Sequence, residues 1–279
     1  MAKNIGLVLG GGGARGIAHL GVIKALDERG FVPEAIAGCS MGGIVGAMVC
    51  AGMPTKDIIK AFGKLETRDL LDFGAMGGMI GADGIEKKLI EYLPGTFEEL
   101  ELPLKVTAVD VQTGKLVIFG KGALVPALRA TSSLPGILTP TRHQGRVFID
   151  GGLLNNLPVD VIRTMTLEPV VAVDVASPPN RRLDFDHHQN IFEKVKKLAR
   201  KEFRTLTIEL FMKSFDIPAA MITDLRLSID PPELLIRPKL DVNFGLEDIH
   251  RAEEAYQVGY QAAVEALDGS DWYDPDVER

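Results

Sequence analysis

The sequence is short of cysteine, of excess positive charge and of long apolar runs, and each shortage excludes a class of protein. Cys39 and Cys50 are the only cysteines, so no disulfide framework is expected and a reducing compartment fits. The net charge is −7, whereas nucleic-acid binding usually needs a basic face. No stretch approaches the roughly 18 apolar residues of a membrane span, and the start is too short and glycine-rich for a signal peptide. We therefore expect a cytoplasmic protein without a nucleic-acid partner.

Apolar residues and glycines are abundant instead. Of 279 residues, 46% are apolar, which is ample for a substantial core. Strands are expected at 4–10, 34–40, 104–111, 115–119, 146–150, 169–177 and 234–242, and helices at 16–30, 41–52, 83–93, within 123–136, and at 158–165, 191–215 and 246–267. Strands that alternate with helices predict an α/β fold, a three-layer sandwich around a mostly parallel sheet. We expect a catalytic core at 4–177, an extension of the same domain at 178–267, and a flexible tail at 268–279.

A run of four glycines opens the first candidate motif, "GGGGARG" at 10–16. It contains a G-x-G-x-x-G match, but a dinucleotide site needs an acidic residue after the second strand, and that strand ends in Gly38, Cys39 and Ser40. A phosphate-binding P-loop would need a following G-K-[ST], which is also missing. Consecutive glycines before a helix can aim several backbone N–H groups at one point, so the run predicts a nest for a phosphate or an oxyanion.

The second motif is a serine between two glycines, Gly38-Cys39-Ser40-Met41-Gly42. A serine at a sharp turn from strand to helix exposes its hydroxyl, and glycines two positions away relieve crowding at that turn. The small residues Gly43, Gly46 and Ala47 on the next helix would let another backbone approach it closely. In the alternative interpretation, Ser40 only caps that helix.

The third motif is Asp150-Gly151-Gly152, an aspartate at the end of a strand followed by two glycines. The alternative is an aspartate that only stabilises a turn. All three motifs follow strands predicted to be parallel, so they should gather at one edge of the sheet. An anion nest, a nucleophile and a carboxylate base would together suit acyl transfer.

A histidine would complete a serine triad, so each histidine is a candidate. The five are His19, His143, His187, His188 and His250. Those that follow Asp150 lie in a polar loop or on a predicted surface helix, and a nucleophile near residue 40 is early for an α/β-hydrolase. A dyad of Ser40 and Asp150 fits the sequence better.

Through these motifs, residues 4–177 resemble the patatin-like phospholipase family, and the small single-domain bacterial members most closely. "ATSSLPGILTP", residues 130–140, also resembles the segment that precedes the catalytic aspartate in that family. The family resemblance implies the following roles: Ser40 as nucleophile, Asp150 as proton acceptor, the N–H groups near Gly11, Gly12 and Gly13 as oxyanion hole, Arg15 and Gly16 in the oxyanion motif with Arg15 fixing the loop, Gly38 and Gly42 as elbow glycines, and Gly151 and Gly152 in the acid loop. One departure is Gly10, where plant members carry an aspartate; this affects only the anchoring of the loop.

The resemblance implies a serine esterase that cleaves fatty acyl esters through an acyl-enzyme, with no metal or cofactor. Asp150 would need partial desolvation and a raised pKa to act as the base. An acyltransferase would use the same residues, and a non-catalytic lipid-binding regulator is the third alternative.

Two segments bear on the substrate, a lipid or other acyl ester. Residues 73–84 are rich in glycine and methionine and could form an adaptable wall of an acyl pocket or a plain loop. The basic amphipathic helix expected from Ile191, over 191–212, has three interpretations: a peripheral contact with an anionic membrane, a lid, or a helix packed on its own core.

Overall fold

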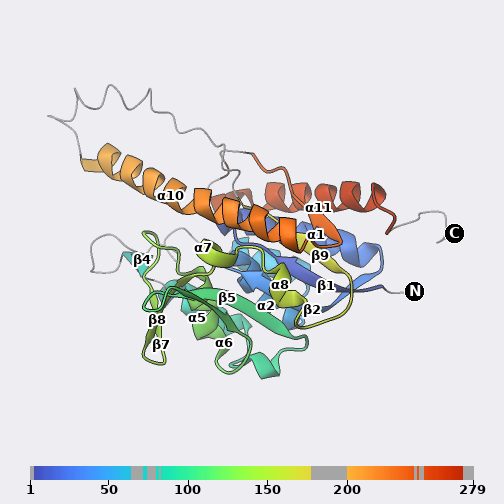
Figure 1. Cartoon of the computed structure of the whole chain (residues 1–279), viewed down its shortest axis with the longest axis horizontal. Coiled ribbons are helices and arrows are strands. Elements are labelled where there is room, and N and C mark those ends of the chain that lie inside the picture. Colours follow the sequence, from blue (N-terminus) through green and yellow to red (C-terminus); the bar gives the residue numbers. More distant parts are fainter. Residues whose placement is uncertain are drawn as a thin grey trace.

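The central feature of the computed structural model is an eight-stranded mixed sheet (Figure 1). The structure describes residues 3–63, 72–73, 80–81, 83–176, 200–241, 244 and 248–272. Five strands are parallel: β10 (Leu234–Ile236), β9 (Val170–Val173), β1 (Lys3–Leu9), β2 (Phe31–Cys39) and β5 (Leu104–Asp110), in that spatial order. The strands β6 (Lys115–Phe119), β8 (Arg146–Asp150) and β7 (Thr141–His143) are antiparallel to their neighbours. A separate pair joins β3 (Asp72–Phe73) and β4 (Ile80–Gly81).

Helices cover both faces of the sheet, which confirms the three-layer α/β sandwich (Figure 1). One face carries α1 (Ala18–Glu28), α2 (Met41–Cys50), α3 (Thr55–Gly63), α5 (Asp83–Tyr92), α6 (Leu124–Ser132) and α11 (Ala252–Asp268), and the other carries α7 (Gly152–Asn155), α8 (Val159–Ile162) and α10 (Arg200–Ile229). Three 3-10 turns complete the described elements: η1 (Gly13–Ile17), η2 (Phe97–Glu99) and η3 (Asp248–Arg251). Along β1, Leu7 and Leu9 point into the first layer and Val8 into the second, so the strand is apolar on both sides.

The last helix packs directly on the first one. A Cβ added at Gly21 of α1 would lie 2.0 Å from the carbonyl oxygen of Tyr256, and one at Gly259 of α11 would lie 2.0 Å from that of Ala18. Since neither glycine has a side chain, the two helix backbones touch, and α11 contributes to the same core as β1 and β2.

Most predicted elements are confirmed, with three differences. The helix α3 is present although its sequence, interrupted by Lys56 and Lys60, was not predicted to be helical. The helix expected over 191–215 lies outside the described residues up to 199; α10 begins at Arg200 and continues through Pro218 to Ile229. Residues 73–84 lie largely outside the described part, as do 273–279 of the expected tail. Within the described ranges, no helix has the length and hydropathy needed to span a membrane.

The third difference determines the site: β8 was expected to be parallel, but it is antiparallel to β5. One edge of β5 pairs with β6. Along the other edge, Thr107 pairs with Cys39 of β2 and the next residue, Ala108, pairs with Asp150 of β8. The two strands therefore meet end to end on the same side of β5, which brings the residue after β2 next to the last residue of β8.

Candidate active site

Ser40 lies in the turn between β2 and α2, in a conformation that is unusual for a residue with a side chain. Its φ is 52° and its ψ is −126°, in the left-handed half of backbone space. Such a conformation costs roughly 1–3 kcal/mol and persists only where surrounding contacts hold it. Here the Ser40 N–H donates to Oγ1 of the fully buried Thr131 at 2.9 Å, and the Ser40 carbonyl accepts from the N–H of Gly43 at 2.9 Å. The serine is a half-buried strained residue rather than a simple helix cap.

The glycines on either side of Ser40 are required by backbone contacts. A Cβ at Gly42 would lie 2.1 Å from the carbonyl oxygen of Leu9, and a Cβ at Gly38 would lie 2.7 Å from the nitrogen of Gly43. The expectation that Gly43 and Gly46 admit a neighbouring backbone is wrong, because their nearest neighbours are side chains. The end of β1 instead meets α2 at Gly42, which sets the glycine loop beside the serine.

Asp150 is the hydrogen-bond partner of the serine. The Ser40 hydroxyl donates to Asp150 Oδ2 at 2.6 Å, while Asp150 Oδ1 accepts from the N–H of Gly152 at 2.8 Å and contacts Sγ of Cys39 at 3.6 Å. The aspartate is only 3% exposed. A Cβ at Gly151 would lie 2.3 Å from the carbonyl oxygen of Thr107, so the acid loop also depends on a close backbone approach.

Burial changes the pKa values of two neighbouring side chains, Asp150 and Cys39. Desolvation raises the pKa of Asp150 from 3.8 to about 6, against hydrogen bonds from Ser40, Gly152 and Cys39 that lower it. Desolvation, together with the charge of Asp150, raises the pKa of the Cys39 thiol well above its usual value. Near neutral pH Asp150 is thus ionised but far more basic than an exposed aspartate, and Cys39 is a neutral thiol.

The glycine loop is fixed by contacts to its carbonyl groups. His19 Nε2 lies 2.8 Å from the Gly10 oxygen; burial lowers the pKa of this histidine to about 4, so the neutral ring donates to that carbonyl. Asn156 makes two hydrogen bonds with Gly11: Nδ2 donates to the Gly11 oxygen at 3.2 Å, and the Asn156 carbonyl accepts from the Gly11 N–H at 3.3 Å. Among the described residues, none accepts from the N–H of Gly12 or Gly13. The loop lies against Ser40, since a Cβ at Gly11 would be 3.0 Å from Ser40 Cβ.

Arg15 ties the glycine loop to distant parts of the chain. The side chain is 3% exposed; its Nε donates to the Val175 oxygen at 2.9 Å, and its Nη1 donates to the oxygens of Asp241 at 3.2 Å and Phe244 at 3.5 Å. A Cβ at Gly16 would lie 2.4 Å from Cγ of Met41, the residue after the serine. Both contacts hold the loop in register with the turn at Ser40.

The histidines do not join this site in the part of the chain that the structure describes. His19 is behind the loop, His143 is on β7 against Phe119, and His250 is exposed in η3; His187 and His188 lie outside the described residues. Sequence analysis missed Thr131 and Asn156, which hold the serine and the loop. The only signal was position, since each lies in a segment flanking the acid motif.

Comparisons with known proteins show which family the chain resembles. The model of the family described as patatin-like phospholipase matches residues 7–163. An uncharacterised NTE family protein of Mycobacterium tuberculosis is 37% identical over 178 residues, which cover 62% of this chain and 49% of that protein. Lysophospholipase NTE1 of Coccidioides immitis is 29% identical over 286 residues, covering 95% of this chain and 18% of that protein. The chain thus spans about half or less of the length of these two relatives.

A solved structure shares the architecture. The crystal structure of VipD from Legionella pneumophila aligns with a TM-score of 0.57 and 16% identity, covering 96% of this chain and 67% of that one. At this identity the likeness concerns the fold alone. With the family model matched over more than half of the sequence, the chain belongs to the patatin-like phospholipase family.

Proposed function

We propose that the protein is a lipid acyl hydrolase that uses Ser40 as nucleophile and Asp150 as general base. The observation that carries this proposal is the 2.6 Å hydrogen bond from the strained serine to a buried carboxylate. A base needs hydrogen-bond reach to the proton and a pKa near the working pH, and the raised pKa of Asp150, about 6, meets the second condition.

The reaction has two halves. Ser40 Oγ attacks the ester carbonyl while its proton moves to Asp150 Oδ2, giving a tetrahedral intermediate with a negatively charged oxygen. Collapse breaks the bond to the alcohol, which takes the proton from Asp150, and leaves an acyl-enzyme on Ser40. Water then attacks this ester, gives its proton to Asp150, and the acid is released as the proton returns to the serine.

The developing oxyanion needs donors with fixed directions. The N–H groups of Gly12 and Gly13 suit this role, because the N–H of Gly11 already donates to Asn156. Peptide planarity links each carbonyl to the N–H of the next residue, so the contact of Asn156 Nδ2 with the Gly11 carbonyl also sets the direction of the Gly12 N–H. Asn156 is therefore a positioning residue. Loss of one oxyanion donor typically lowers the rate about 10²–10³-fold.

The substrate class comes from the family and from the relatives. Their printed names describe phospholipases and a lysophospholipase, and this chain covers only part of the latter. We infer a fatty acyl ester of a phospholipid or lysophospholipid as the substrate.

Labelling with a fluorophosphonate probe tests the proposal. The wild-type protein should be labelled, Ser40→Ala should not, and Asp150→Asn should be labelled about 10²–10⁴-fold more slowly. Ser228→Ala, which removes an exposed serine on α10, is the matched control and should be labelled like the wild type. Labelling of Ser40→Ala, or none of the wild type, would contradict the proposal. Product analysis with an added alcohol then separates hydrolysis from acyl transfer.

A further inference from the structure

The helix α10 exposes a continuous row of large aliphatic side chains. Its members, spaced seven, four, four and four residues apart, have these exposed fractions: Leu210 42%, Ile217 45%, Met221 69%, Leu225 61% and Ile229 76%. Residues at such spacings lie on one side of a helix, and 19 residues span about 29 Å. A row of this length on a folded surface usually marks a contact site. We call these five residues the α10 stripe.

The face of α10 around the stripe also carries serines and two charged residues, Lys213 and Asp224. The two serines on the same side, Ser214 and Ser228, donate their hydroxyls to the carbonyl oxygens of Leu210 at 2.8 Å and Leu225 at 2.7 Å, within the helix itself. Asp224, which is exposed three residues after Met221, pairs with Arg237 at 3.5 Å. These polar groups beside the stripe therefore have partners within the protein, and the five aliphatic side chains suit an apolar environment.

The opposite side of α10 is firmly attached to the acid loop. Ala219 and Thr223 are buried, and Arg226 donates to the Leu154 carbonyl of α7 at 3.2 Å. The helix thus lies over the segment that follows Asp150 (Figure 1). Whatever covers the stripe is held beside the candidate active site.

The charge of the neighbouring sequence indicates the occupant. Residues 191–204 contain six Lys and Arg against two Glu, in a chain with a net charge of −7. A basic segment that precedes an exposed aliphatic helix face in the sequence is typical of proteins that bind an anionic lipid interface. A second copy of the chain fits less well, because a row one side chain wide is narrow against the roughly 800 Å² per partner of a standard interface.

We propose that the α10 stripe docks the protein on an anionic lipid surface. The purpose of docking rests on the proposed function, because docking would bring an acyl ester to Ser40. The docking itself does not require catalysis. In the docked protein, the lipid surface covers the five exposed side chains.

The test is flotation with vesicles, using the full chain with Ser40→Ala so that no lipid is consumed. The parent should bind phosphatidylcholine vesicles that contain phosphatidylglycerol more tightly than phosphatidylcholine alone, and salt should weaken the binding. Met221→Ser with Leu225→Ser should weaken binding at least tenfold, whereas the control Ile90→Ser with Leu167→Ser, on α5 and before β9 and likewise exposed, should not.

Three outcomes would overturn the proposal: no binding by the parent, equal binding by the stripe variant, or a dimer in sedimentation velocity that the stripe substitutions dissociate. Fluorophosphonate labelling of the stripe variant with Ser40 intact should equal that of the wild type. Failure of labelling in both proteins would refute the proposed function while stripe-dependent binding stood, so the two failures are distinguishable.

Discussion

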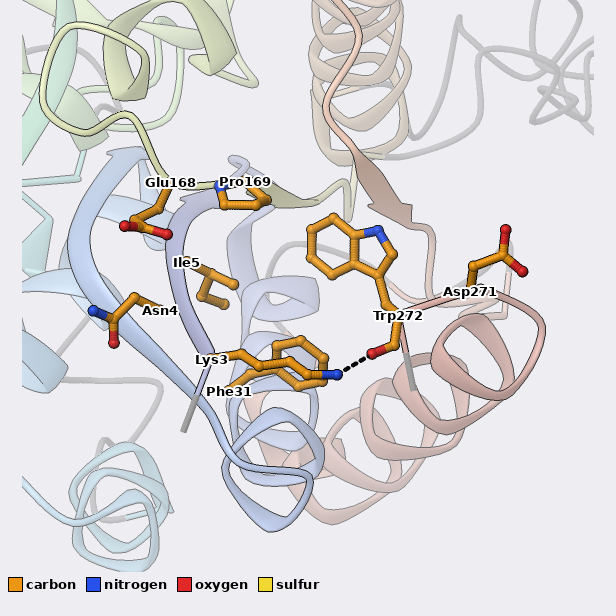
Figure 2. Close-up of a pocket in the computed structure, with 8 residues that line it drawn as sticks. All are labelled: Lys3, Asn4, Ile5, Phe31, Glu168, Pro169, Asp271 and Trp272. Atoms are coloured by element: carbon orange, nitrogen blue, oxygen red, sulfur yellow. Dashed lines mark hydrogen bonds between the residues drawn. The ribbon is translucent and has the colours of Figure 1, made fainter. Parts of the chain in front are cut away.

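The two ends of the parallel strands hold different features: a pocket borders the amino ends, and a fixed polar pair of side chains lies at the carboxyl ends. The amino ends of β1, β2 and β9 border an open pocket of about 400 Å³ (Figure 2). There the Lys3 ammonium donates to the Trp272 carbonyl and lies 5.3 Å from the ring centroid of Phe31, so its charge is used within the protein. The carboxyl ends instead hold Ser40 and Asp150 in a 2.6 Å hydrogen bond.

A hollow by itself does not make a reactive site. A hollow only indicates where a molecule fits, whereas bond cleavage needs groups with fixed directions and altered acidity. Backbone strain at Ser40 and desolvation at Asp150 both occur at the carboxyl ends. We therefore expect substitutions there to change reactivity, and substitutions around the pocket to change stability alone.

The largest difference in stability is expected between two glycine substitutions, one at each end of the parallel strands. Gly42→Ala should lower the free energy of unfolding by about 3 kcal/mol or more, because its Cβ would meet the Leu9 carbonyl oxygen at 2.1 Å and backbone would have to move. Gly30→Ala, before β2, meets no atom within 4 Å and should cost only about 1–2 kcal/mol for its φ of 74°. Urea denaturation measures both; equal losses would contradict the close packing of β1 on α2.

Asp150→Asn should have the next largest effect, one that depends on pH. A folded-state pKa of about 6 against 3.8 means that the native state favours protonated Asp150. Protonated Asp150 therefore stabilises the folded wild-type protein below about pH 4, and this stabilisation is lost as the pH rises through 6. The loss in the free energy of unfolding is about 3 kcal/mol. The stability of Asp150→Asn relative to wild type should therefore rise by that amount from pH 4 to 8.

Ser40→Ala is the control for that experiment, since it retains the buried carboxyl and should keep the pH dependence. For the wild type, kcat/KM on a soluble ester should fall tenfold per unit below about pH 6, where Asp150 becomes protonated. An acid limb below pH 4 would argue against Asp150 as the base.

The sequence predicted much of this end of the sheet, but partly for a wrong reason. Ser40 and Asp150 were expected to meet because both would follow parallel strands. They meet because β8, antiparallel, ends on β5 beside the end of β2. Strand direction depends on the connections around β6 and β7, and the alternation of apolar residues in a strand is the same in either direction.

Residues that act through another residue were the hardest to predict. The glycine motifs indicated an unusual backbone conformation from the sequence alone. Thr131 and Asn156 show no such signal, and only the fold places them against Ser40 and Gly11. The exposed side chains of α10 beyond residue 215 were also missed, because the helix was expected to end there, whereas α10 continues to Ile229.

Asn156→Ala tests the positioning of the loop. Loss of the 3.2 Å contact with the Gly11 carbonyl should free the peptide that presents the Gly12 N–H, and kcat on a short-chain ester should fall about tenfold with little change in KM. Asn4→Ala, on the exposed rim of the pocket, should leave both constants unchanged. A fall in Tm without a fall in kcat would reduce Asn156 to a structural residue.

Trp272→Ala should have the smallest effect of these substitutions. Unlike Asn156→Ala, it should change stability and leave reactivity unchanged. The indole stacks on the buried Phe31 with ring centroids 6.0 Å apart, so its removal should cost about 1 kcal/mol in the free energy of unfolding. Labelling of Ser40 should not change, because the ring is at the amino ends of the strands and contributes nothing to the polar groups at the carboxyl ends. Slower labelling of Trp272→Ala at equal folded fraction would mean that the two ends are coupled through β1 and β2, and that the pocket is part of the machinery after all.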